Sequence, residues 1–223
     1  MAVAKPAGLA TQAPPGIPSV EAWLRGRLEP GAYVAVPHRL DRAVSGVLLL
    51  AVTPRAARKL SRQFERREIT KTYLALVAGE AADAVAAGGE EWRDFLVKVP
   101  DEPRARVAAA AEADAREAVT RVRILARPFP GTLLVGLEPL TGRMHQLRVQ
   151  AASRGLPIVG DALYGATESP IPAFAPAADP RRRPIALHAW RITYADPDSC
   201  EPTCVEAPLP AGWPESVRSV VAS

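Results

Sequence analysis

The chain has 223 residues, which fits one domain of ordinary size, and 48% of them are hydrophobic, as in a typical globular protein. No apolar run approaches the roughly 20 residues that a membrane-spanning helix needs, and the N-terminus lacks the apolar core of a signal peptide, so we expect a cytoplasmic protein. The net charge is +4 and the pI about 9.4, which favours a polyanionic partner without requiring one. Only four of the 28 basic residues are lysines, which indicates codon bias, so the positions of the arginines matter more than their number.

Two helices and three strands are predicted in the first third of the chain, after a Pro- and Gly-rich loop over residues 1–18. The apolar run Val47–Val52 predicts a buried strand, and Thr53 before Pro54 predicts a helix N-terminus. A helix is predicted over Ser19–Leu28 with Val20, Trp23 and Leu24 on one face, followed by a strand over Tyr33–Val36. The helix that begins at Pro54 is expected to run to about Arg67, with Ala57, Leu60 and Phe64 on its buried stripe, and a strand is predicted over Ile69–Ala78. The cationic residues of that helix fall mainly on its exposed faces: Arg55, Arg58, Lys59, Arg62 and Arg66.

The rest of the chain predicts more strands than helices. Residues 79–117 have weak periodicity and are expected to form a variable excursion with one short strand over Phe95–Val99. The remaining predicted elements are strands over Val119–Ala126, Thr132–Leu137, Pro157–Gly160 and Ile185–Tyr194, helices over Thr141–Gly155 and Glu215–Val221, and an exposed Pro-rich loop over 165–185. This order predicts an α+β fold, a single domain over residues 1–223 on a mixed, largely antiparallel sheet with flanking helices and loops.

Asp41 is the first candidate reactive group. It lies in the segment His38-Arg-Leu-Asp-Arg, between basic residues and a small-residue turn, directly before the buried strand. A carboxylate at the mouth of a buried strand is costly unless it is paired or used chemically. The alternative is an aspartate that caps its own turn.

Metal and redox sites receive little support from the sequence. Cys200 and Cys204 have no second Cys or His pair nearby, so they are expected to be free thiols and not zinc ligands. The three histidines, His38, His145 and His188, could in principle form a zinc site. We expect no metal and no cofactor, with these histidines holding loops by hydrogen bonds.

Six short motifs occur in a fixed order along nearly the whole chain, from Lys5 to about Pro197. They are Lys5-Pro-Ala-Gly8, His38-Arg-Leu-Asp41, Lys71-Thr-Tyr73, Thr141-Gly-Arg-Met-His-Gln-Leu-Arg148, Gly160-Asp-Ala-Leu-Tyr-Gly165 and Leu187-His-Ala189. In this order they resemble the RluA-type pseudouridine synthases, which isomerise a uridine within an RNA strand. The resemblance implies a pseudouridine-synthase-like catalytic domain, an RNA substrate, either ribosomal or transfer RNA, and chemistry without a cofactor.

The resemblance also implies three catalytic residues. Asp41 would be the catalytic aspartate, acting as nucleophile or as base, and Arg143 would pair with it, which favours the ionised carboxylate. Tyr73 would stack on the target base. Alternatively, Arg143 would contact a phosphate or be solvated, and Tyr73 would be an ordinary strand tyrosine.

Further residues are expected to contact the substrate or its RNA. Arg39 would fill the gap left by the flipped base, Lys71 would lie near the site, and Leu147 would close the uracil pocket. Alternatively, Arg39 would contact a phosphate, Lys71 would be a solvated lysine at the strand edge, and Leu147 would be a core residue of its helix. The remaining expected contacts are His38, His145, Gln146 and Arg148, and the basic helix 54–67 and Arg181–Arg183 are candidates for phosphate contact.

Some positions depart from the family pattern. Ala43 and Val44 replace a small acidic or polar residue and a threonine, so a hydroxyl that orients the catalytic loop is missing. Gln150 stands where histidine is frequent, the strand before Lys5 is expected to be shortened or absent, and no accessory N-terminal RNA-binding module is expected.

These departures motivate one rival, a non-catalytic RNA-binding relative that retains the fold. The other rival is a metal-dependent nuclease built on Asp41 and the histidines. A monomer without a protein partner is the expected state.

Overall fold

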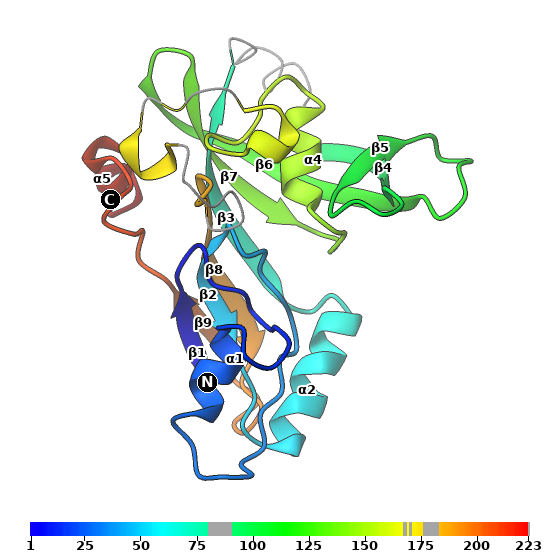
Figure 1. Cartoon of the computed structure of the whole chain (residues 1–223), viewed down its shortest axis with the longest axis vertical. Helices are drawn as coiled ribbons and strands as arrows, with labels where there is room; N and C mark the ends of the chain where they lie inside the picture. Colours follow the sequence, from blue (N-terminus) through cyan, green and yellow to red (C-terminus); the bar gives the residue numbers. More distant parts are fainter. Residues whose placement is uncertain (80–90, 167–168, 170, 176–182, 223) are drawn as a thin grey trace. The chain divides into compact units, whose positions relative to one another are not determined.

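The computed structural model describes residues 1–79, 91–166, 169, 171–175 and 183–222. The chain divides into two compact units (Figure 1). The first contains Met1–Lys71 and His188–Pro210, and the second contains Thr72–Pro176, Ile185–Leu187 and Ala211–Ser223. The expectation of one catalytic domain over the whole chain stays a prediction.

The sheet of the first unit combines antiparallel and parallel pairs. Its strands are β1 (Ala2–Lys5), β2 (Ser45–Leu49), β8 (Leu187–Ala195) and β9 (Pro202–Glu206). β1 pairs antiparallel with β2, β2 pairs parallel with β8, and β8 pairs antiparallel with β9. All five residues of β2 are buried, which confirms the strand predicted from the apolar run. The loop predicted over residues 1–18 is wrong at its start, because a four-residue strand forms there.

Two capped helices complete the first unit. α2 (Pro54–Glu65) is capped by the Thr53 hydroxyl, which confirms the predicted N-terminus. α1 (Val20–Arg25) is capped by the Ser19 hydroxyl and ends three residues before the predicted Leu28. Val20 and Leu24 are buried, whereas Trp23, predicted on the same face, is 44% exposed and its ring lies beneath the Arg27 guanidinium. The strand predicted over Tyr33–Val36 is reduced to one isolated bridge, between Ala35 and Ala51.

The second unit contains an antiparallel sheet in the order β3-β7-β6-β4-β5. Its strands are β3 (Thr70–Ala78), β4 (Glu91–Lys98), β5 (Ala105–Ala108), β6 (Arg116–Phe129) and β7 (Thr132–Pro139), with the first two residues of β3 belonging to the first unit. β6 is longer than predicted, because two register shifts carry it past the irregular positions near Ile124 and Ala126. Residues 80–90 of the predicted excursion lie outside the described part.

Short helices pack around this second sheet (Figure 1). They are α4 (Gln146–Ala152), α5 (Glu215–Ala222) and the 3-10 turns η1 (Ala162–Tyr164) and η2 (Pro172–Phe174). The helix predicted from Thr141 begins only at Gln146, because His145 adopts a left-handed backbone with φ 52°. The strand predicted over Pro157–Gly160 is a single bridge from Ile158 to Val77.

The strand pairing confirms the predicted α+β class with a mixed sheet, because β2 and β8 pair parallel while the other pairs described above are antiparallel. Within the described residues, no helix combines the length and apolar character that a membrane crossing requires.

Candidate active site

The loop that carries Asp41 is fixed at both of its flanks. On one side, the Thr11 hydroxyl donates to the Leu40 carbonyl at 2.8 Å and accepts from the Leu40 amide at 3.1 Å. On the other side, the Gly8 amide donates to the Arg42 carbonyl at 2.7 Å. Asp41 is half-buried between these anchors. The Thr11 hydroxyl and the Gly8 amide therefore hold the backbone on both sides of the candidate carboxylate.

Lys5 places a buried cation in the same region. Its side chain is fully enclosed, and its ammonium donates to the carbonyls of Pro6, Leu9 and Arg42 at 2.9, 2.8 and 3.3 Å. Burial lowers the pKa of Lys5 to about 8, and the negative charge of Asp41 opposes that shift. The sequence identified the motif that contains Lys5, but its place as a buried cation near Asp41 depends on the tertiary structure.

The turn after Asp41 is joined to β8. The Ser45 hydroxyl lies 2.8 Å from Nδ1 of His188, whose Nε2 is 3.0 Å from the Ala207 carbonyl. Because a carbonyl only accepts, Nε2 carries the proton and Nδ1 accepts from Ser45. Gly46 has φ 124°, and a β-carbon there would collide with the Ala189 backbone. Val44, in place of threonine, is buried, so it contributes packing where the family has a hydroxyl.

His38 joins the Asp41 loop to α2. Its Nε2 accepts from the Leu49 amide at 2.9 Å, and its ring stacks on Phe64 with centroids 4.7 Å apart. Burial lowers the pKa of His38 to about 3, and the Lys71 ammonium acts in the same direction. The imidazole is therefore neutral near pH 7, as an acceptor must be. Arg39, its neighbour, is exposed.

Gln146 organises the turn that presents Arg143 in the second unit. Its side-chain carbonyl accepts from the Thr141 hydroxyl and the Arg143 amide, and its amide donates to Val119 and Thr120. Arg143 itself donates from Nε to the Glu117 carbonyl at 2.9 Å. The guanidinium is thus oriented by β6 and by a buried glutamine.

The His145 side chain continues into a second buried network. Its Nδ1 lies 2.8 Å from the Tyr164 hydroxyl. Arg148 forms a bidentate ion pair with Asp161, at 2.7 and 2.8 Å, and both side chains are buried. The Arg148 guanidinium also lies over the Tyr164 ring. These contacts are internal to the second unit, and an RNA contact by Gln146 or Arg148 stays a prediction.

Comparison with known proteins identifies the family. A family model described as RNA pseudouridylate synthase matches residues 1–153. The chain belongs to this family. It is 37% identical over 164 residues to the dual-specificity RNA pseudouridine synthase RluA of Haemophilus ducreyi, covering 74% of this chain and 68% of that protein. The resemblance to RluA-type enzymes is therefore confirmed.

Two further relatives extend this comparison. The tRNA pseudouridine synthase C of Salmonella typhimurium is 35% identical over 198 residues, which cover 84% of this chain and 72% of that protein. The solved structure of human RNA Pseudouridylate Synthase Domain Containing 4 aligns with a TM-score of 0.74 at 21% identity, covering 99% of this chain and 89% of that one. At that identity the human structure supports the fold alone.

The other residues that the pseudouridine synthase motifs single out lie in ordered strands and helices. Tyr73 is half-buried in β3, where it pairs with Leu137. Lys71 lies two residues earlier in the same strand, and burial lowers its pKa. Leu147 is buried in α4. The structure places Asp41 in the first unit and Tyr73 and Arg143 in the second, and a shared cavity for the three stays a prediction.

Gln150 replaces the histidine that is frequent in the family, and it is completely buried. It accepts from the Thr120 hydroxyl and donates to Asp94 at 2.8 Å and to the Trp92 and Ala118 carbonyls. The substitution therefore leaves a saturated network between α4 and β4. The sequence showed the replacement but not these partners, which come from strands 30 or more residues away.

The two histidines of the first unit, His38 and His188, make hydrogen bonds within the fold. Both ring nitrogens of His188 have protein partners, and His38 accepts a backbone hydrogen bond. Across the described residues, no group of three or more His, Cys, Asp or Glu side chains is arranged to hold a metal ion.

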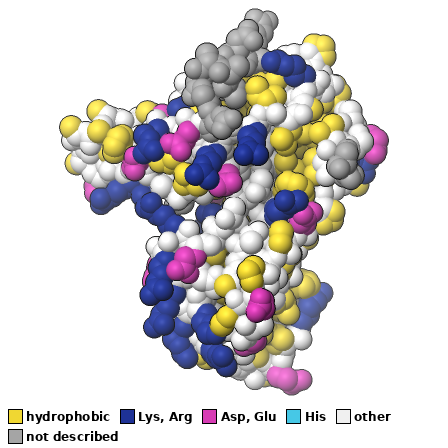
Figure 2. Space-filling view, turned by 180° about the vertical axis from the view of Figure 1, so that it is seen from behind, with side chains coloured by type: hydrophobic (Ala, Val, Ile, Leu, Met, Phe, Trp, Pro, Cys, Tyr) yellow, Lys and Arg dark blue, Asp and Glu magenta, His cyan; other side chains and the backbone are white. Residues whose placement is uncertain are grey.

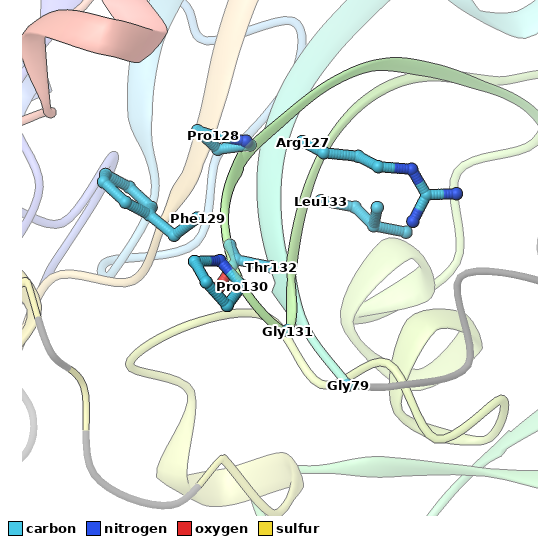
Figure 3. A pocket seen from close by; sticks show the side chains of 8 residues that line it. All are labelled: Gly79, Arg127, Pro128, Phe129, Pro130, Gly131, Thr132 and Leu133. Atoms are coloured by element: carbon cyan, nitrogen blue, oxygen red, sulfur yellow. The ribbon is translucent and has the colours of Figure 1, made fainter.

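A hollow of about 570 Å³ lies in the second unit at the turn between β6 and β7 (Figure 3). Arg127, Phe129 and Leu133 contribute its larger side chains, and Gly79 closes one edge. None of the predicted catalytic residues lines it. Among its described lining residues, the only charged group is the Arg127 guanidinium.

Proposed function

We propose that this chain converts specific uridines of ribosomal or transfer RNA into pseudouridine, with Asp41 as the catalytic carboxylate. The observation that carries the proposal is the family match over residues 1–153, which contains the motifs of Asp41, Tyr73 and Arg143. The names of the relatives include a dual-specificity RNA enzyme and a tRNA enzyme, which supports an RNA substrate for this chain.

The proposed roles follow from what the reaction requires. A uridine must leave its stack, which costs a few kcal/mol, and an aromatic face such as that of Tyr73 compensates by about 1–3 kcal/mol. The carboxylate of Asp41 then acts on the detaching nucleoside, as nucleophile or as base. Arg143 would stabilise its negative charge, and the fixed loop around Asp41 reduces the entropy lost in positioning.

Lys5 supports this assignment on independent grounds. A buried ammonium is expensive, and this one is retained next to the Asp41 loop with all three donors satisfied by carbonyls. A turn aspartate with only a capping role would need no such cation.

The decisive experiment is tritium release from RNA labelled at carbon 5 of uridine. We expect release by the wild-type chain and a loss of at least about a thousandfold in Asp41→Asn, with RNA binding retained. Binding without release by the wild type, unchanged by Asp41→Asn, would instead identify a non-catalytic RNA-binding relative. We further propose that the enzyme acts as a cytoplasmic monomer, which light scattering and cell fractionation test.

A further inference from the structure

The positive charge of the chain is concentrated in one segment of the first unit. Residues 54–67, which contain α2, carry six cationic side chains and one carboxylate, while the whole chain has a net charge of only +4. The remainder of the chain is therefore not net positive. A general arginine bias explains the number of arginines but not this concentration.

Four of these arginines form a regular row, which we call the α2 arginine row: Arg55, Arg58, Arg62 and Arg66. All four are exposed. At about 1.5 Å of rise and 100° of rotation per residue, they follow one another every ~4.5–6 Å within an arc of about 80°. The buried residues Ala57 and Leu60 point to the opposite side. Figure 2 shows dark blue side chains gathered along the edge of the first unit where α2 lies.

The row is not neutralised within the fold. Arg55, Arg58 and Arg62 make no ion pair with any carboxylate of the described residues, and Arg66 has only a long contact of 3.8 Å with Glu68. Lys59, in contrast, donates to the Pro197 carbonyl at 2.6 Å. The lysine of α2 thus serves the fold, while the arginines direct their charge to solvent.

This arrangement lowers the stability of the helix. Like charges at i,i+3 and i,i+4 destabilise a helix by about 0.2–0.5 kcal/mol per pair. The first turn contains no acidic residue, so Arg55 lies unfavourably at the positive end of the helix dipole. An exposed face that costs stability and has no internal partner indicates an external anionic partner.

We propose that the α2 arginine row binds the phosphate backbone of the RNA substrate without reading its sequence. The identity of the partner as RNA rests on the proposed function. A row of guanidiniums at this spacing suits successive phosphates of one strand, and arginine binds phosphate through paired N–H donors. The His38–Phe64 stack couples α2 to the Asp41 loop, and two hydrogen bonds between Gln63 and Ala195 hold α2 to β8. RNA bound along α2 is therefore held on the unit that carries Asp41.

The test replaces all four arginines by glutamine, in an Asp41→Asn background that leaves the RNA unmodified. Binding of unfractionated transfer RNA is measured by fluorescence anisotropy between 50 and 300 mM salt. Each phosphate contact contributes about 0.9 to the magnitude of the slope of log K against log salt for B-form DNA and about 0.7 for single strands, and we use this range for RNA. We expect the slope to fall by about 3 and the affinity at 0.1 M salt to fall at least tenfold. The thermal midpoint should stay equal or rise, because like-charge repulsion is removed.

A matched control changes the net charge equally. Arg25, Arg104, Arg106 and Arg121 are exposed and paired with carboxylates, and their replacement by glutamine should change the slope by less than 1. An equal effect of both quadruple variants, or a slope unchanged by the α2 variant, would overturn the proposal. So would tighter binding of the parent to phosphatidylserine vesicles than to RNA.

The activity assay separates this inference from the proposed function. With Asp41 intact, the α2 variant should raise KM for tritium release while kcat at saturating RNA stays within about twofold. A fall in kcat with KM unchanged would contradict a backbone-binding role. Absence of release by the wild type would refute the catalytic proposal, while the salt slopes would still decide the role of the row.

Discussion

The exposed arginines of α2 and those of the second unit differ in whether a carboxylate lies beside them. In the second unit, exposed arginines such as Arg104, Arg106 and Arg121 each face a glutamate. In α2, Arg55, Arg58 and Arg62 face solvent without a described carboxylate partner. Arginine content alone therefore says little about RNA binding, since the neighbouring carboxylates decide whether a guanidinium has charge left for a partner.

Arg148 is the extreme case of an arginine committed to the fold, and its replacement should give the largest effect. Arg148→Met leaves the Asp161 carboxylate buried without its bidentate partner, so we expect a loss of about 3–5 kcal/mol in the free energy of unfolding. Urea denaturation measures it. The double variant Arg148→Met/Asp161→Leu should recover most of the loss, and a single-variant loss below about 1 kcal/mol would show that the pair is not buried in solution.

The anchoring of α2 through His38 can be tested by pH. The pKa of His38 is about 3 in the folded state and near 6.5 when unfolded, so the unfolded chain takes up a proton first as the pH falls. The contribution of His38 to the free energy of unfolding is therefore complete well above pH 6.5, and it is lost progressively as the pH falls from about 6.5 to about 3. For one such histidine, the expected loss at pH 5 is about 2 kcal/mol.

The comparison variant is His38→Gln, whose side-chain carbonyl can still accept from the Leu49 amide. Its unfolding free energy, measured at pH 7.5 and pH 5, should decrease less than that of the wild type. His188 remains as a second buried histidine, because its pKa is also lowered by burial. Equal acid sensitivity in both proteins would contradict the lowered pKa of His38.

Replacing an exposed arginine by glutamate should have opposite effects on stability in α2 and in the second unit. Arg55→Glu adds a carboxylate to the first turn of α2 and pairs it with Arg58 and Lys59, so we expect stabilisation of about 1 kcal/mol together with weaker RNA binding. Arg121→Glu places a carboxylate opposite Glu91 and Glu138 on neighbouring strands, so we expect destabilisation of up to about 1 kcal/mol. Thermal unfolding measures the two stability changes, and fluorescence anisotropy measures RNA binding. Stability changes of the same sign in both variants would contradict the difference between the two groups of arginines.

The sequence predicts elements well where burial imposes a pattern. The apolar run of β2 and the capped, one-sided helix α2 are confirmed because both have continuous buried faces. β9 was missed because it alternates only between exposed and half-buried residues, so no fully buried face marks it. α4 was predicted too early, because the buried Gln146 holds residues Thr141–Arg143 in a turn that a helical pattern conceals.

In the candidate site, the sequence likewise predicts what is local and misses what depends on contacts between distant segments. Asp41 and Arg143 follow from ordered motifs, which are local in sequence. The anchors of the Asp41 loop could not be predicted, because Thr11 and Lys5 contact it across about 30 and 37 residues. Arg148 was expected on RNA, but its internal partner Asp161 becomes visible only once the chain is folded.

The double hydrogen bond between Thr11 and Leu40 has a consequence for protein engineering. Thr11 also accepts from the Glu21 amide through its carbonyl, and Ala10 bridges to Ser19, so both ends of the segment 12–18 are fastened next to each other. The length and composition of that segment can then be varied without transmitting strain to Asp41. It is a natural insertion point for a grafted peptide that would retarget the enzyme to a chosen transcript.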